Sequence, residues 1–288
     1  MNKLSREKQI KIVAALVEGN SIRAISRMTD VARNTISKLV LDMGEACQKY
    51  HDENVRGLTT KRVECDEAWS FVAKKDKALH TDEQGTFGIG SVWTWVAIDA
   101  DSKLAISYLV GNRDGEDAHV FMKDVASRLT NKIQLTTDGH RAYLDAVDRA
   151  FHGDIDYAML IKQYGNPPQS PDTRYSPGEV TSIKKQRVLG RPVKEYVSTS
   201  YVERQNLTMR MSMRRFTRLT NGFSKKVEFH MASVALHFMY YNFVRIHQTL
   251  RMTPAMSAGV TNHLWNMGNL VDLLDTRDLA GKLAALEI

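Results

Sequence analysis

Residues 62–72 have the sequence RVECDEAWSFV, in which two sets of side chains alternate along the chain. A period of two is typical of a β-strand whose two faces pack differently. One face would carry Val63, Cys65, Glu67, Trp69 and Phe71, and the other Glu64, Asp66, Ala68 and Ser70. The stretch therefore predicts a first strand that places Asp66 and Glu67 on opposite faces.

The segments that follow predict the rest of a mixed sheet. Residues 91–111, SVWTWVAIDADSKLAISYLVG, contain two β-rich runs joined at a turn around residues 99–101. Residues 114–129 have helical spacing, 133–138 (IQLTTD) form a fourth strand, 142–151 a helix, and 157–161 a short strand or helix. Three strands, helix, strand, helix is the order of a ribonuclease H-like α/β fold, a mixed sheet with flanking helices.

Three acidic residues on these elements are candidate metal ligands. Asp66 lies in the first strand, Asp138 ends the fourth, and Glu203 lies on a later helix, with separations of 138 − 66 = 72 and 203 − 138 = 65 residues. Only a fold can bring them together. Divalent cations prefer carboxylate oxygens, and two ions can catalyse phosphodiester chemistry. We therefore expect two Mg²⁺ or Mn²⁺ ions, bridged by Asp66 and Asp138, with Glu203 holding one.

Other acids compete for this role. Glu64 and Glu67 flank Asp66, although Glu67 should point to the other face. Asp99 and Asp101 have the sequence context of turn residues, and Glu195 that of a loop.

The helix that carries Glu203 should present two stripes. Val202, Met209, Met213 and Phe216 have apolar spacing, and Glu203, Asn206, Arg210 and Arg214 form a neighbouring polar stripe. Between Arg204 and Lys226 the chain has no acid but contains Arg210, Arg214, Arg215, Arg218 and Lys225. A solvated helix face usually mixes charges, so we expect Asn206, Arg210, Arg214 and Arg215 to bind DNA phosphates near the acids.

Residues 1–50 predict a small helical domain. Helices over 5–18, 21–28 and 32–50, with a tight break between the last two, match the helix-turn-helix plan. The residues that would face the major groove are Arg33, Asn34, Thr35, Ser37 and Lys38. The alternative is a three-helix bundle that does not contact DNA.

The remaining boundaries follow from composition. Residues 51–60 are polar and predict a linker, and 61–252 would form the catalytic domain. Within it, 164–195 holds five of the six prolines and predicts an insertion loop, either a disordered connector or a basic flap that contacts DNA. A helix over 225–247 would carry His230, His237 and His247 as structural residues, and 253–288 would form a helical tail.

Bulk properties narrow the class of protein. The 288 residues carry a net charge of +7, which favours a polyanionic partner. No apolar run is long enough to span a membrane, and the N-terminus lacks a secretory core. Two isolated cysteines predict neither a disulfide framework nor a zinc site. We expect a cytoplasmic protein, associated with the nucleoid when bound to DNA, with no membrane partner.

Four motifs together resemble a known family. DEAWSFV, TTDGHRAY, SYVERQN with RRFTRLTNGFSKK, and YNFVRIHQTLRMTPAM are similar, in this order, to bacterial insertion-sequence transposases of the Asp-Asp-Glu type, of the insertion-element-one class. The resemblance covers about residues 62–256. It implies that Asp66, Asp138 and Glu203 bind Mg²⁺ or Mn²⁺, and that Tyr241, Asn242, Arg245 and His247 have a structural role. The N-terminal zinc finger frequent in that family is missing from this sequence.

The resemblance also implies a reaction. Such enzymes hydrolyse DNA at the terminal inverted repeats of an element and use the freed 3′-hydroxyl to attack target DNA. Because two ends must be joined, we expect a homo-oligomer, a dimer or larger. Two alternatives stay open: a DNA-binding regulator without catalysis, and a ribonuclease H-like nuclease that cuts without strand transfer.

Overall fold

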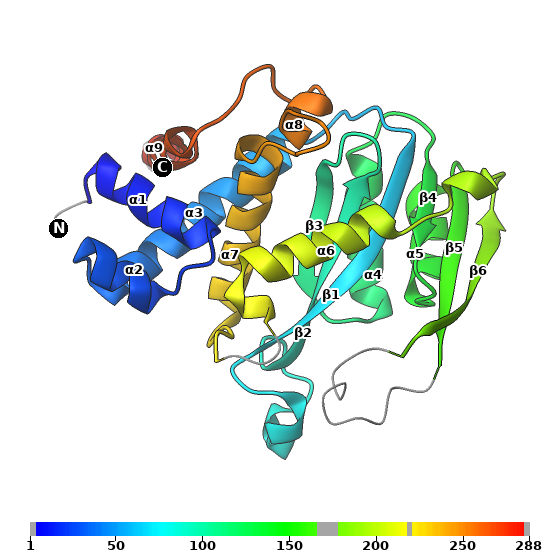
Figure 1. The fold of residues 1–288 in the computed structure, drawn as a ribbon, viewed down its shortest axis with the longest axis horizontal. Helices are drawn as coiled ribbons and strands as arrows, with labels where there is room; N and C mark the ends of the chain where they lie inside the picture. Colours follow the sequence, from blue (N-terminus) through cyan, green and yellow to red (C-terminus); the bar gives the residue numbers. More distant parts are fainter. Residues whose placement is uncertain (1–3, 166–177, 218–220, 285–288) are drawn as a thin grey trace.

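A computed structural model of the chain describes residues 4–165, 178–217 and 221–284, with side chains up to residue 275. Within these residues the strands form a six-stranded sheet in the order β3-β2-β1-β4-β5-β6 (Figure 1). The strands are β1 (Arg62–Val72), β2 (Gly90–Asp99), β3 (Ala105–Gly111), β4 (Gln134–Thr137), β5 (Asp156–Tyr164) and β6 (Val180–Leu189). β1 pairs antiparallel with β2 and parallel with β4. The predicted ribonuclease H-like α/β sheet is confirmed.

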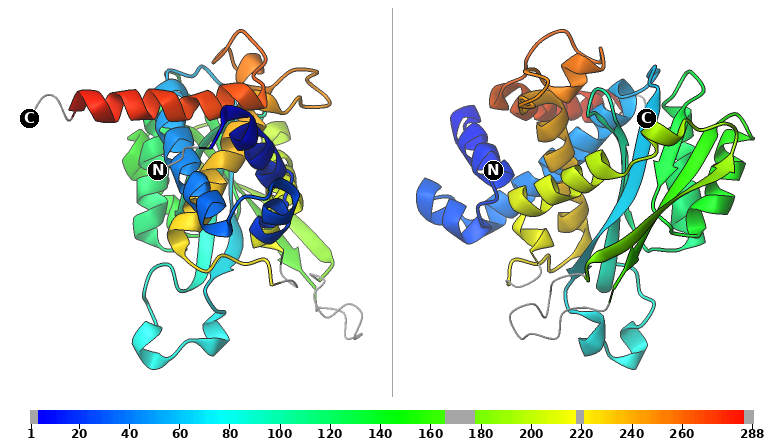
Figure 2. Two further views of the ribbon diagram at one scale, coloured as in Figure 1. Left: turned by 90° about the vertical axis from the view of Figure 1, so that its left-hand side faces the viewer. Right: turned by 45° about the vertical axis from the view of Figure 1, so that its right-hand side comes forward.

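Helices cover both faces of the sheet (Figures 1 and 2). α4 (Gly115–Ser127) and α5 (Ala142–Phe151) pack on one face, where Cys65 and Trp95 share a core with Tyr143. α6 (Ser200–Ser212) and α7 (Val227–Met239) pack on the other, where Ala68 shares a core with Phe238. The alternation along β1 therefore separates two hydrophobic cores.

The three predicted N-terminal helices are present. They are α1 (Arg6–Val17), α2 (Ile22–Thr29) and α3 (Arg33–Asn54). Ser21 caps α2, because its hydroxyl accepts a hydrogen bond from the backbone N–H of Ala24 at 3.1 Å. α3 extends to Asn54, so the first four residues of the expected linker are helical.

The N-terminal helices pack directly against the rest of the chain. α3 crosses α7 at Gly44, where an added Cβ would lie 2.3 Å from the Cβ of Ala232 (Figure 1). Met43 and Cys47 of α3 belong to the same core as Trp95 of β2. A glycine is needed at this crossing because the two helix backbones approach closely.

The helix expected over 225–247 is shorter. α7 is followed by a π-helical turn, η6 (Tyr240–Val244), so His247 lies outside the helix. The turn directs Asn242 at β3, where its side-chain amide donates to the carbonyl of Ala105 at 2.9 Å and accepts from the N–H of Ala105 at 3.0 Å. The Tyr241 hydroxyl donates to the carbonyl of Lys103 at 3.0 Å. These two residues of the YNFVRIH motif thus join the helical layer to the sheet.

The segment expected as an insertion loop contains a strand. β6 pairs antiparallel with β5 at the edge of the sheet, and residues 166–177 lie outside the described part of the chain. A strand is possible here because the prolines stand before and after residues 180–189. The C-terminal segment forms α8 (Pro254–Ser257) and α9 (Met267–Ala284), and Leu270 and Leu274 of α9 are buried in the core.

Candidate active site

The fold brings Asp66 and Asp138 together. Cys65 of β1 is paired with Thr137, the last residue of β4, so the residue that follows each of them reaches the same point of the sheet. One oxygen atom from each of Asp66, Asp138 and Glu67 lies within 4.8 Å of the other two. We call these three residues the acid cluster.

Glu67 is the member that was expected only as a competing acid on the other face of β1. It lies on the α5 side of the sheet, next to Tyr143, and accepts a hydrogen bond from Nε of Arg113 at 2.9 Å. Its carboxylate nevertheless reaches Asp66 and Asp138 because β4 ends at Thr137. On the side of β1 where β4 lies, no described strand continues past Thr137, so the two faces of the sheet are open to each other there. The alternation along residues 62–72 contains no information on where β4 stops.

Burial and like charge shape the electrostatics of the acid cluster. Burial, followed by the charges of Asp138 and Glu203, raises the pKa of the Asp66 carboxyl to about 7. Burial and the charge of Asp138 raise the pKa of Glu67 to about 7 as well. Arg113 partly offsets this repulsion, since its Nη2 also lies 3.4 Å from Asp138.

The donor set fits a divalent metal ion. Three carboxylates supply only hard oxygen ligands, which Mg²⁺ and Mn²⁺ prefer, and their summed negative charge exceeds that of the single arginine beside them. The side-chain amide of Asn206 on α6 donates to Asp66 at 2.8 Å and orients this carboxylate.

Glu203 lies at the border of the acid cluster. Its Oε1 accepts hydrogen bonds from the Thr199 hydroxyl at 2.6 Å and from the Lys162 ammonium of β5. Its charge acts on Asp66, and it stands one helical turn before Asn206, which contacts Asp66 directly. The structure therefore does not bring Glu203 into the acid cluster, whose three members are Asp66, Glu67 and Asp138. Its carboxylate is held by Thr199 and Lys162, while its charge still acts on Asp66.

Glu64, which was considered as a competing acid, has a different contact. Its Oε2 accepts hydrogen bonds from the backbone N–H groups of Tyr201 at 2.7 Å and Val202 at 3.1 Å. A carboxylate at this place satisfies free N–H groups in the first turn of α6. Glu64 thus ties the first turn of α6 to β1, two residues before Asp66.

The predicted polar stripe of α6 is wrong in its last member. α6 ends at Ser212, Met213 has an extended backbone (φ −126°, ψ 111°), and residues Arg214–Phe216 form a separate 3-10 turn, η5. Asn206 is buried at the acid cluster and Arg210 is partly buried on the helix. Arg214 and Arg215 line a separate cavity. Arg218 lies outside the described residues.

The residues expected to read DNA are accessible at the N-terminal end of α3. Arg33, Asn34, Thr35 and Lys38 are exposed, and Ser37 is partly buried. Of the three histidines expected on one helix, His230 and His237 are buried on α7. Burial lowers the pKa of each to about 3. The ring nitrogens of His230 lie 3.2 Å from the Ser70 hydroxyl and 3.1 Å from the Ser224 hydroxyl, which supports the expected structural role.

Comparison with known proteins gives structural but no sequence relatives. No protein-family model and no curated protein sequence matches this chain. The fold is similar to the piggyBac transposase synaptic complex with hairpin DNA (10% identity, 95% of this chain and 72% of that chain, TM-score 0.42). It is also similar to the Mos1 transposase paired-end complex (12%, 55% and 60%, TM-score 0.24) and the Mos1 strand transfer complex (11%, 83% and 76%, TM-score 0.25).

The first of the Mos1 matches spans 60% of that chain's length. At these identities and scores the similarities establish no residue-level correspondence. Across the described parts of this chain, none of the helices combines the length and hydropathy that a bilayer crossing requires.

Proposed function

We propose that this chain is a DNA transposase of the Asp-Asp-Glu type, which cleaves the ends of an insertion element and joins the 3′-hydroxyl to target DNA. The observation that supports the proposal is the meeting of Asp66 and Asp138, 72 residues apart in sequence, at the border of β1 and β4. Glu203 of α6 acts on Asp66 through its charge. A nuclease needs hard-ion ligands at one point, which the acid cluster supplies, and positive charge that attracts DNA, which agrees with the net charge of +7.

Each residue near the acid cluster has a proposed task. Asp66 and Asp138 would hold two Mg²⁺ or Mn²⁺ ions between them, and Glu203 one of the two. When bound, these ions supply positive charge that stabilises the phosphodiester transition state. Asn206 orients Asp66, while Glu64 fixes the start of α6.

The attacking groups in this reaction are water and the 3′-hydroxyl of DNA. No protein hydroxyl has to act as a nucleophile, so a covalent adduct between protein and DNA is not expected. This distinguishes the proposed reaction from that of the serine and tyrosine recombinases.

The proposed partner is double-stranded DNA, in the form of terminal inverted repeats and target DNA. The exposed side chains Arg33, Asn34, Thr35 and Lys38 at the start of α3, with Ser37 beside them, suit a helix-turn-helix contact in the major groove. Synapsis of two ends requires a homo-oligomer, and the reaction would take place in the cytoplasm on the nucleoid.

The test is a cleavage and joining assay with labelled duplexes of the DNA that flanks the coding region on each side, in Mg²⁺ or Mn²⁺. We expect the wild type to release 3′-hydroxyl ends and to join them to a target plasmid. Glu203→Gln should abolish both products and keep duplex binding. The matched control is Glu195→Gln, an exposed acid shortly before α6, which should remain active.

The alternatives predict other products. Cleavage without joined product would identify a nuclease. Duplex binding with no cleavage in either metal would identify a regulator. Either result overturns the proposal.

A further inference from the structure

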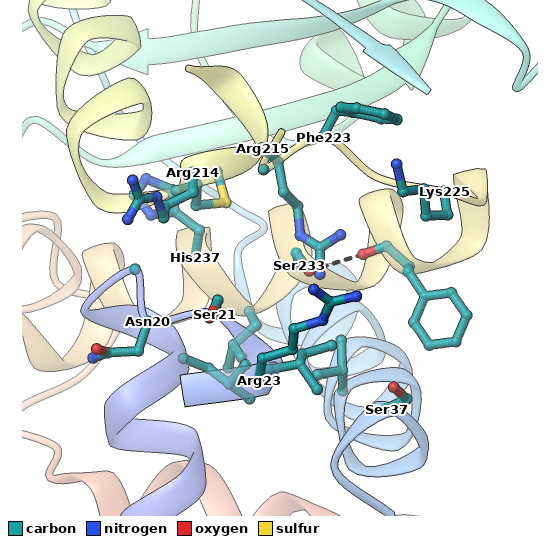
Figure 3. Close-up of a pocket in the computed structure, with 18 of the residues that line it drawn as sticks. Asn20, Ser21, Arg23, Ser37, Arg214, Arg215, Phe223, Lys225, Ser233 and His237 are labelled. Atoms are coloured by element: carbon teal, nitrogen blue, oxygen red, sulfur yellow. Dashed lines mark hydrogen bonds between the residues drawn. The ribbon is translucent and has the colours of Figure 1, made fainter. Parts of the chain in front are cut away.

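The structure contains a large cavity at some distance from the acid cluster. It has a volume of about 960 Å³ and lies between the N-terminal helices, residues 213–215 and 221–226, and α7 (Figure 3). Five cations of the described residues line it, so we call it the basic cavity. They are Arg23, Arg214, Arg215, Lys225 and Lys226.

No acid lines the described part of the basic cavity, although one pairs with a lysine at its border. The described lining contains no Asp or Glu, and Glu228 forms an ion pair with the exposed Lys226 at 3.7 Å. Figure 3 shows the guanidinium groups of Arg23 and Arg215 pointing toward one another from opposite walls. Nη1 of Arg215 donates to the Ser224 hydroxyl at 2.8 Å, and burial lowers the pKa of this arginine to about 10. Two guanidinium groups that face each other without an acid favour an anion between them.

Two aromatic side chains line the basic cavity beside aliphatic residues of the N-terminal helices and α7. Phe223 and Phe229 line the basic cavity and are half-buried, so each keeps part of its surface open. Aromatic side chains among cations are typical of sites for single-stranded nucleic acid, because unpaired bases stack on the rings while phosphates bind the cations. In a duplex the base faces are covered. A single nucleotide would leave most of the five cations without a phosphate.

α6 connects the basic cavity with the acid cluster. Glu203 lies near its first turn and Ser212 at its end, nine residues later, which is about 14 Å along the axis at the helical rise. The residues that follow, Arg214 and Arg215, enter the basic cavity. A strand that leaves the acid cluster can therefore follow α6 into it.

We infer that the basic cavity binds a single DNA strand, with phosphates between Arg23 and Arg215 and a base against Phe229. The choice of DNA as the polymer rests on the proposed function, whereas strand binding itself does not require catalysis. In that reaction, cleavage frees a strand end beside Glu203. The basic cavity would keep this end within reach of the acid cluster until it is joined.

The test measures binding of a fluorescein-labelled oligothymidylate to the full-length chain in EDTA. Arg23→Gln should weaken binding about three- to tenfold and reduce the slope of log K against log salt by about 0.7, the value for one lost phosphate contact on a single strand. Phe229→Leu should weaken binding about fivefold and leave the salt slope unchanged, because it removes stacking and no charge. Arg149→Gln, an equal loss of charge on the exposed side of α5, should change neither quantity.

Three results would overturn the inference. The first is that Arg23→Gln binds the strand as tightly as the wild type. The second is that a duplex of equal length binds more tightly than the strand and loses affinity equally in the variants. The third is that thymidine monophosphate displaces the strand and binds with the same affinity as the strand. Because EDTA removes the metal, strand binding is measured independently of cleavage. A wild type that binds the strand and never cleaves refutes the proposed function alone. A wild type that cleaves and joins, with Arg23→Gln binding normally, refutes only the inference.

Discussion

Replacing Asp66 by asparagine should stabilise the metal-free protein at pH 8, although this carboxylate is a proposed metal ligand. In the folded protein the pKa of Asp66 is about 7, against an ordinary value of 3.8. Without a metal ion, the folded state therefore holds a carboxylate whose ionisation is opposed by burial and by the charge of Asp138. An asparagine has nearly the same shape and carries no charge.

The size of the effect follows from proton linkage. The pKa of Asp66 is higher in the folded than in the unfolded state. Its contribution to the free energy of unfolding is therefore fully present below pH 3.8 and is lost as the pH rises to about 7. With these two values, the loss is about 2 kcal/mol at pH 5 and about 4 kcal/mol at pH 8. The free energy of unfolding of Asp66→Asn minus that of the wild type should therefore grow by about 2–3 kcal/mol between pH 5 and pH 8.

The assay is urea unfolding of both proteins in EDTA at the two pH values. The double difference is the change, between pH 5 and pH 8, in the unfolding free energy of the variant minus that of the wild type. It cancels any pH-independent change in the hydrogen bond from Asn206. It also cancels the buried His51, His230 and His237, whose lowered pKa values act in the opposite direction in both proteins. The matched control is Asp145→Asn on the exposed face of α5, which should give a double difference near zero.

A second measurement connects this effect with metal binding. Saturating Mg²⁺ at pH 8 should raise the unfolding free energy of the wild type and have little effect on Asp66→Asn. A double difference near zero for Asp66→Asn, or one of opposite sign, would refute the description of the acid cluster as a set of mutually repelling buried carboxylates.

Two further predictions concern contacts around the site and in the core. Lys162→Met should raise the affinity for Mn²⁺ about threefold, measured by calorimetry, because the ammonium no longer competes with the ion for Glu203. The effect is small because the ion pair is only partly buried. Weaker binding would show that Lys162 supports the metal site. Gly44→Ala should lower the unfolding free energy by about 2–3 kcal/mol, because the new Cβ would overlap Ala232. The double variant with Ala232→Gly should recover part of the loss. An unchanged midpoint of urea unfolding would contradict the close approach of α3 and α7.

The regular elements were predictable because they depend on neighbours in the sequence. The period-two alternation of residues 62–72 corresponds to β1 over the same residues, and the helix expected over residues 142–151 is α5. The start of α2 is local as well, because capping by Ser21 needs only a hydroxyl three residues before a free N–H. The order of elements predicted the mixed sheet, in which β1 lies parallel to β4 and Asp66 meets Asp138.

Ends of elements were less predictable where distant contacts determine them. The helical spacing of Arg210 and Arg214 continues past Ser212, yet α6 stops there, and Met213 turns into the core beside Phe216. Arg214 and Arg215 are thereby removed from the acid cluster and line the basic cavity. Periodicity describes which face a residue would occupy on a continuing helix and contains no information on where packing ends that helix.

The sequence by itself determined the order of the elements from β1 to α5, the position of Asp66 in β1 and of Asp138 directly after β4, and the excess of basic residues after Glu203. Only the tertiary structure decided that Glu67 joins Asp66 and Asp138, that Glu64 binds the first turn of α6, and that Lys162 holds Glu203. The physical reason is distance along the chain. Alternation and helical spacing act over a few residues, whereas each of these contacts joins elements that become neighbours only when the sheet and its helices pack together.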